Sequence, residues 1–74
     1  MWKTGAMLIK GKVYKYQDKV SEVGSEYGIE GGKISKAYVS RDGVAVLNYE
    51  RGLDLEPVDE GAALALGILM KEYN

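Results

Sequence analysis

The chain has 74 residues, a formal net charge of −1, and neither cysteine nor histidine. This length fits one domain over residues 1–74, and 46% hydrophobic with 28% charged residues is typical of a globular chain. The missing cysteine and histidine exclude disulfides, thiol catalysis and the usual nitrogen and sulfur ligands of zinc. We therefore expect no catalytic residue, no metal site and no cofactor, and the near-neutral charge argues against general attraction to nucleic acid.

No segment of the chain predicts secretion or membrane insertion. Residues 1–9 lack the long apolar region that a secretory signal needs. The longest apolar run, residues 62–70, is far shorter than the about 20 residues that span a bilayer. We therefore predict a cytoplasmic protein without a membrane partner.

Two segments of alternating polarity around Lys10-Gly11 predict a first β-hairpin. A two-residue loop there pairs Leu8 with Val13, Met7 with Tyr14, Gly5 with Tyr16 and Lys3 with Asp18. One face then carries Met7, Ile9, Tyr14 and Tyr16, and the opposite face is a mixture of Ala6, Leu8, Val13, Lys15 and Gln17. A slip by one residue would exchange the two faces.

Residues 21–32 contain four glycines in twelve residues, which indicates a loop or a bulged strand rather than a regular element. One interpretation is that these glycines serve turns that connect two hairpins. The other is that they let a ligand approach exposed backbone amides, with Ser25, Tyr27 and Lys33 contributing side chains.

A second hairpin is predicted over residues 33–40 and 44–49, because Asp42-Gly43 between them is one of the strongest short turn signals. A two-residue loop pairs Val39 with Val46 and Tyr38 with Leu47. Both faces carry apolar side chains, which fits a sheet that packs on a helix through one face.

The clearest helix of the sequence lies near its end. Pro57 fits the first helical turn, and Asp59 and Glu60 complement the positive end of the helix dipole. One stripe at helical spacing comprises Ala62, Leu66, Leu69 and Tyr73. The predicted fold class is therefore α+β: an antiparallel four-stranded β-meander packed on one C-terminal helix, in the order ββββα.

The predicted helix is apolar on all sides, since residues 62–70 contain no polar side chain. One sheet cannot cover the whole circumference of such a helix, so the helix must be buried on more than one side. We therefore expect self-association, most simply as a two-fold homodimer. The expected interface residues are Leu64, Ala65, Ile68 and Met70.

Six tyrosines and one tryptophan without phenylalanine are the most unusual feature of the composition. Tyrosine favours strands and is frequent at interfaces, where it offers an apolar body with a polar tip. Arg51 and Lys33 are suited to hold phosphates while Tyr27 stacks on a base, and an acidic patch is suited to imitate nucleic acid. The predicted ligand- or partner-binding residues are Ser25, Tyr27, Lys33, Tyr49, Arg51 and Asp54.

Three segments carry a resemblance to a known family: GSEYGI at residues 24–29, GGKISK at 31–36 and YERGLDLEP at 49–57. Through them the chain resembles a family of small uncharacterised proteins of Gram-positive bacteria and their phages, from about Gly11 to the last helix. It departs from the family's pattern at Leu53, where those proteins often have tryptophan. The resemblance implies a mobile-element setting, in which small non-catalytic proteins act by binding, for example as inhibitors of host defence nucleases or as sponges for nucleotide signals.

The sequence leaves several classes of function open. The first is a non-enzymatic, homo-oligomeric accessory protein of phage type that sequesters or blocks a host protein or a small nucleotide. The second is a structural or assembly module that joins a larger complex through its apolar helix. Further alternatives are a direct nucleic-acid binder, using Tyr14 and Tyr16 on the basic first hairpin, and an enzyme that relies on tyrosine, lysine or carboxylates.

Overall fold

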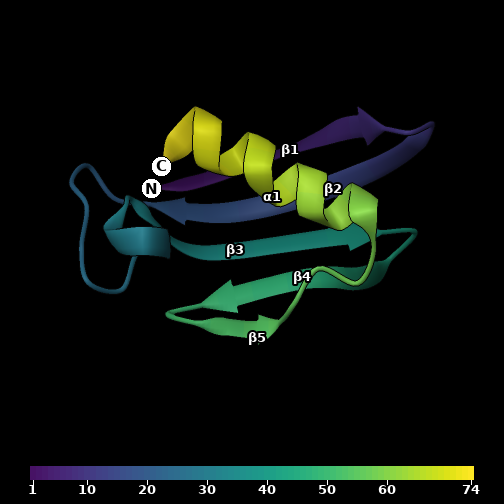
Figure 1. Cartoon of the computed structure of the whole chain (residues 1–74). Coiled ribbons are helices and arrows are strands. Elements are labelled where there is room, and N and C mark those ends of the chain that lie inside the picture. Colours follow the sequence, from purple (N-terminus) through teal and green to yellow (C-terminus); the bar gives the residue numbers. More distant parts are fainter.

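The computed structural model describes residues Met1–Asn74, which form one antiparallel sheet with a single helix across one of its faces (Figure 1). The strands follow one another in chain order across the sheet. They are β1 (Trp2–Ile9), β2 (Lys12–Val20), β3 (Ile34–Arg41), β4 (Val44–Glu50) and β5 (Leu53–Leu55). A short 3-10 helix, η1 (Ile29–Gly31), precedes β3, and the helix α1 (Glu60–Tyr73) follows β5. The α+β class and the C-terminal helix are confirmed.

The sheet has five strands rather than the four predicted. The additional strand, β5, is only three residues long and pairs with the end of β4 through Leu53 opposite Tyr49 and Leu55 opposite Asn48. The alternation of Leu53, Asp54 and Leu55 is too short to predict a strand. It is stabilised by pairing with β4, and its own sequence does not indicate a strand.

The register predicted for the first hairpin is confirmed in all four pairs, from Leu8 opposite Val13 to Lys3 opposite Asp18. Lys10 and Gly11 have φ of 54° and 77°, the left-handed pair that a two-residue hairpin turn requires. The predicted division of the two faces follows from this register. Met7, Ile9, Tyr14 and Tyr16 face the helix and join the core or pack against it.

The second hairpin turns at Asp42-Gly43 as predicted, but its predicted register is wrong. Val39 lies opposite Leu47 rather than Val46, because the register shifts between Val39 and Ser40. Val46 is the additional residue of a β-bulge, and both Val46 and Leu47 are buried. A run with apolar residues at successive positions gives no alternation that could fix its register.

The helix begins later than predicted. Asp59 is its N-cap and Glu60 its first residue, so Pro57 lies in the connection before α1 rather than in the first helical turn. The predicted stripe does face the sheet: Ala62 and Leu69 are buried, and Leu66 and Tyr73 pack against the core. The core under α1 comprises Ile9, Tyr14, Ile29, Ile34, Ala37, Val39, Val46, Leu47, Ala62, Ala65 and Leu69.

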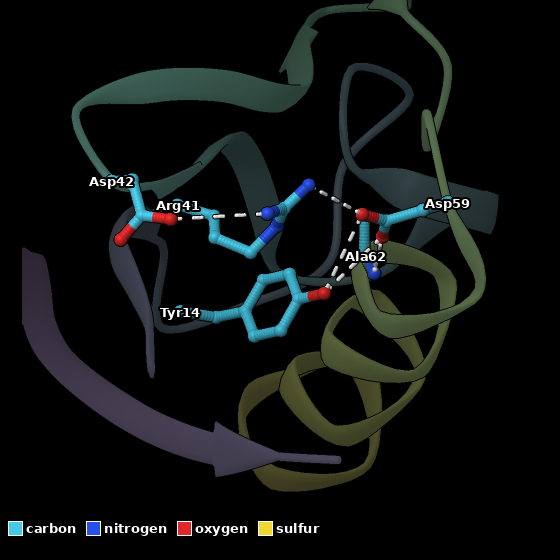
Figure 2. A network of polar contacts seen from close by, with 5 residues as sticks. All are labelled: Tyr14, Arg41, Asp42, Asp59 and Ala62. Atoms are coloured by element: carbon cyan, nitrogen blue, oxygen red, sulfur yellow. Dashed lines mark hydrogen bonds and ion pairs between the residues drawn. The ribbon is translucent and has the colours of Figure 1, made fainter. Parts of the chain in front are cut away.

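The start of α1 is fixed to the sheet by a polar network around Asp59 (Figure 2). The Asp59 carboxylate accepts hydrogen bonds from the Ala62 backbone amide at 2.7 Å, from the Arg41 guanidinium of β3 at 3.1 Å and from the Tyr14 hydroxyl of β2 at 3.3 Å. The Ala62 hydrogen bond, together with the Arg41 charge, holds the pKa of this carboxyl below its ordinary value. The network therefore joins three elements at one charged group.

The other end of the helix is attached through polar side chains as well. The hydroxyls of Tyr16 and Tyr73 lie 3.2 Å apart, and this contact together with burial raises the pKa of Tyr16 to about 12. The side chain of Asn74 accepts a hydrogen bond from the Ile34 amide and donates one to the Ile29 carbonyl, both at 3.0 Å. Both ends of α1 are thereby held over β2 and β3.

Asp18 is a buried carboxylate without a partner beneath the helix. It lies on β2 opposite Lys3 and Ala37, is fully buried, and neither of its oxygens has a hydrogen-bond partner. Burial raises the pKa of this carboxyl from 3.8 to about 7, because the charged form loses its hydration. At neutral pH the folded protein therefore contains a group that opposes its stability.

Gly61 and Gly67 of α1 form a matched pair for testing the network. A Cβ atom at Gly61 would overlap the Tyr14 hydroxyl, whereas nothing lies within 4 Å of one at Gly67. Gly61→Ala should displace Tyr14 from Asp59 and lower the free energy of unfolding by roughly 1–3 kcal/mol. Gly67→Ala should raise it by about 0.5–1 kcal/mol, since alanine favours a helix over glycine. Urea denaturation measures both, and equal effects would contradict the packing described.

Asp18 should make stability fall between about pH 4 and pH 7. Below pH 4 the carboxyl is protonated in both states, and above pH 7 it is charged in both. In between, the unfolded chain loses the proton while the folded chain keeps it, so the free energy of unfolding falls by about 1.4 kcal/mol per pH unit. Asp18→Asn should therefore match the wild type near pH 4 and exceed its stability by a few kcal/mol at pH 8.

Urea denaturation of both proteins across this pH range tests the effect. Asp54→Asn is the control, because Asp54 is an exposed carboxylate. Curves for wild type and Asp18→Asn that stay parallel from pH 4 to pH 8 would show that Asp18 is not the group responsible.

Candidate functional site

Three of the predicted site residues meet where the glycine-rich loop contacts the turn between β4 and β5. The Arg51 guanidinium lies over the Tyr27 ring, 5.0 Å from its centroid, and the Tyr49 hydroxyl donates a hydrogen bond to the Tyr27 carbonyl at 3.2 Å. Arg51 has φ of 56°, a left-handed conformation that is uncommon for arginine. Its backbone amide donates to the Ser35 carbonyl, which anchors the turn on β3.

The other three predicted residues lie outside this contact. The backbone of Ser25 bonds to Gly28 and Gly32 and closes the loop. Lys33 is exposed, and its carbonyl accepts a hydrogen bond from the Ser21 amide. Asp54 is exposed on β5. No hydrogen bond or ion pair of these side chains reaches Tyr27 or Arg51, so the six predicted residues do not form one site.

The glycines of the loop serve close packing within the chain. A Cβ atom at Gly24 would collide with the Gly31 carbonyl, and one at Gly28 would collide with the Gly32 carbonyl. The loop folds back on its own backbone, which is the turn-forming interpretation. This accounts for the glycines without a ligand.

The outward face of α1 exposes apolar residues, as the sequence predicted. Leu64 and Ile68 are 45% and 48% exposed. Two other predicted interface residues are placed differently: Ala65 is fully buried against the sheet, and Met70 is partly buried and packs against the core. Ala65 is thus a core residue of the single chain, because it lies on the same helix face as the buried Ala62 and Leu69.

The face of the sheet opposite the helix has no covering element. Its side chains form rows across the strands: Trp2, Lys19, Lys36 and Glu50 in the first, Thr4, Gln17, Tyr38 and Asn48 in the second, and Ala6, Lys15, Ser40 and Ala45 in the third. Trp2 is 55% exposed and Tyr38 38% exposed. We call these twelve residues the open face.

The middle of the open face is hollowed. A shallow hollow of about 230 Å³ is lined by Thr4, Gly5, Lys15, Tyr16, Gln17, Tyr38 and Ser40. Hydroxyl, amide and ammonium groups thus surround one depression, with the Tyr38 ring at its side. The arrangement offers several hydrogen-bonding groups and an aromatic surface to one ligand.

The open face was missed as a site, although the register of its first two strands was predicted correctly. The aromatic residues expected to bind nucleic acid, Tyr14 and Tyr16, both lie under the helix, where Tyr14 is buried and Tyr16 partly buried. Trp2, which the prediction did not use, and Tyr38 are the aromatic side chains of the uncovered face. Alternation along β2 already assigned Lys15 and Gln17 to the face opposite Tyr14 and Tyr16.

No three carboxylates are close enough together to hold a metal ion. No helix has the length and apolar character that crossing a membrane requires.

The fold and its surfaces define a small α+β domain: a five-stranded meander with one face under a helix and the other uncovered. The chain belongs to the family described as a domain of unknown function, DUF7678, whose model matches residues 1–74. No curated protein and no solved structure matches the chain.

Proposed function

We propose that this protein is a non-enzymatic accessory binding protein whose binding surface is the open face of its sheet. The observation that carries the proposal is that this face is uncovered and yet bears two exposed aromatic rings, lysines and a polar hollow. A solvated sheet face without a partner needs only polar side chains, so exposed tryptophan and tyrosine there favour recognition.

A protein of this kind acts by occupying its partner, as an inhibitor or a sequestering protein does. The resemblance to proteins of Gram-positive bacteria and their phages supports an anti-defence role of phage type in the cytoplasm. The Tyr27–Arg51 contact is a less suitable centre for stacking a nucleotide base, because the guanidinium already covers one face of the Tyr27 ring.

The binding surface should be located by charge reversal on opposite sides of the molecule. The protein is immobilised and exposed to an extract of a Gram-positive bacterium. Lys15→Glu on the open face should retain at least tenfold less material than the wild type. Lys71→Glu on α1 is the matched control, and Arg51→Ala tests the loop contact; both should retain what the wild type retains. The proposal is contradicted if Lys15→Glu retains as much material as the wild type, or if the wild type retains nothing.

We also propose that the protein is a homodimer through the outward face of α1. The support is the pair Leu64 and Ile68, one turn apart and about half exposed. A second copy of the helix would cover these side chains through an isologous contact.

Sedimentation velocity at micromolar concentration tests the dimer. The wild type should sediment as a dimer, and Ile68→Lys as the 8.1 kDa monomer, because a charge at the interface would lose its hydration. Val23→Lys is the control, since Val23 is an exposed apolar residue in the glycine-rich loop. A wild type that sediments only as a monomer would refute the dimer.

A further inference from the structure

We infer that the ligand of the open face is a single-stranded nucleic acid, an inference that rests on the binding surface proposed above. Three properties of the face indicate this class of ligand: its charge, the positions of its aromatic rings, and the hydrogen-bonding groups around them.

The open face is positive although the chain as a whole is negative. It carries Lys15, Lys19 and Lys36 against the single acidic residue Glu50, while the formal charge of the chain is −1. Glu50 pairs with Lys36 at 3.2 Å, and no ion pair engages Lys15 or Lys19. Two lysines therefore stand free, Lys19 in the first row and Lys15 in the third, and their charge is complementary to a phosphate backbone.

The two aromatic rings are spaced along this basic surface. Trp2 is on the edge strand β1, and Tyr38 is two strands away on β3 in the neighbouring row. Two strand spacings and one two-residue step put their Cα atoms roughly 12 Å apart. Exposed rings at such separation on a sheet serve as stacking platforms for bases that are not adjacent in an unstacked strand.

Neutral hydrogen-bonding side chains lie around the two rings. Gln17 and Thr4 face each other across β1 and β2, and Asn48 lies beside Tyr38. With Ser40 at the hollow, these amides and hydroxyls both donate and accept, as the edges of unpaired bases require.

The same properties favour a single strand over a duplex or a protein. In a duplex the base faces are stacked on one another, so Trp2 and Tyr38 would find no face to contact. A protein partner would favour a central apolar patch surrounded by polar groups. Here the centre is polar, and the exposed apolar pair Leu8 and Val13 lies at the hairpin end of the sheet.

Trp2 is the sole tryptophan of the chain, so its fluorescence reports on this face directly. Titration with unlabelled oligonucleotides of about 12 nucleotides, single-stranded DNA and RNA, should quench Trp2 at low salt. Fluorescein-labelled copies should show a matching rise in anisotropy. With the two free lysines engaged, raising the salt from 50 to 200 mM should weaken binding by roughly sevenfold.

Substitutions then separate the contributions of charge and stacking. Lys15→Glu should weaken binding at least tenfold and reduce the salt dependence, and Tyr38→Leu should weaken binding while leaving the salt dependence unchanged. Lys71→Glu makes the same charge change on the helix and should stay within twofold of the wild type. Circular dichroism verifies that each variant is folded.

The inference is overturned by any of three results: no quenching and no anisotropy change with either single strand, equal binding of a duplex, or equal losses in Lys15→Glu and Lys71→Glu. These results are distinguishable from failure of the proposed function. If Lys15→Glu abolishes retention of a protein from the extract while no oligonucleotide binds, the open face recognises a protein and only the present inference fails. If neither retention nor oligonucleotide binding depends on Lys15, both fail.

Discussion

The carboxylate of Asp59 is the group on which the arrangement of this small fold depends. It caps the first turn of α1 through the Ala62 amide and at the same time accepts hydrogen bonds from Tyr14 of β2 and Arg41 of β3. A helix cap usually satisfies amides within its own chain segment. Here the cap also fixes where the helix begins relative to two central strands, and Gly61 leaves the room that the Tyr14 hydroxyl needs.

The position of α1 on one face of the sheet determines which side chains of the sheet are free of packing constraints. Almost all of the large buried apolar side chains lie between α1 and the strands, so the opposite face contributes little to the core. Its side chains are then not constrained by packing. The identities of Trp2, Lys15, Lys19 and Tyr38 are therefore better explained by contacts with something outside the chain than by stability, which is why this face carries the functional proposal.

Sequence patterns predicted elements where polarity alternates and failed where it does not. The first hairpin was predicted to the residue because its alternation and its two-residue turn agree. The second was displaced by the bulge at Val46, since consecutive apolar residues fit either register. Of the six residues predicted to bind a ligand or partner, the left-handed turn at Arg51 brings three together, Tyr27, Tyr49 and Arg51. A contact between residues far apart in the sequence, such as Tyr14 with Asp59, produces no pattern in the sequence around either residue.

The excess of tyrosine over phenylalanine has a structural cause, and this cause helps to identify the binding surface. Tyr14, Tyr16 and Tyr49 each use the hydroxyl in a contact within the chain, with Asp59, with Tyr73 and with the Tyr27 carbonyl. Phenylalanine could fill the same volume but would remove each of these hydrogen bonds. Most tyrosines thus connect elements of the fold and are not free to meet a ligand. Tyr38 has no such intramolecular hydrogen bond, and with Trp2 it marks the open face.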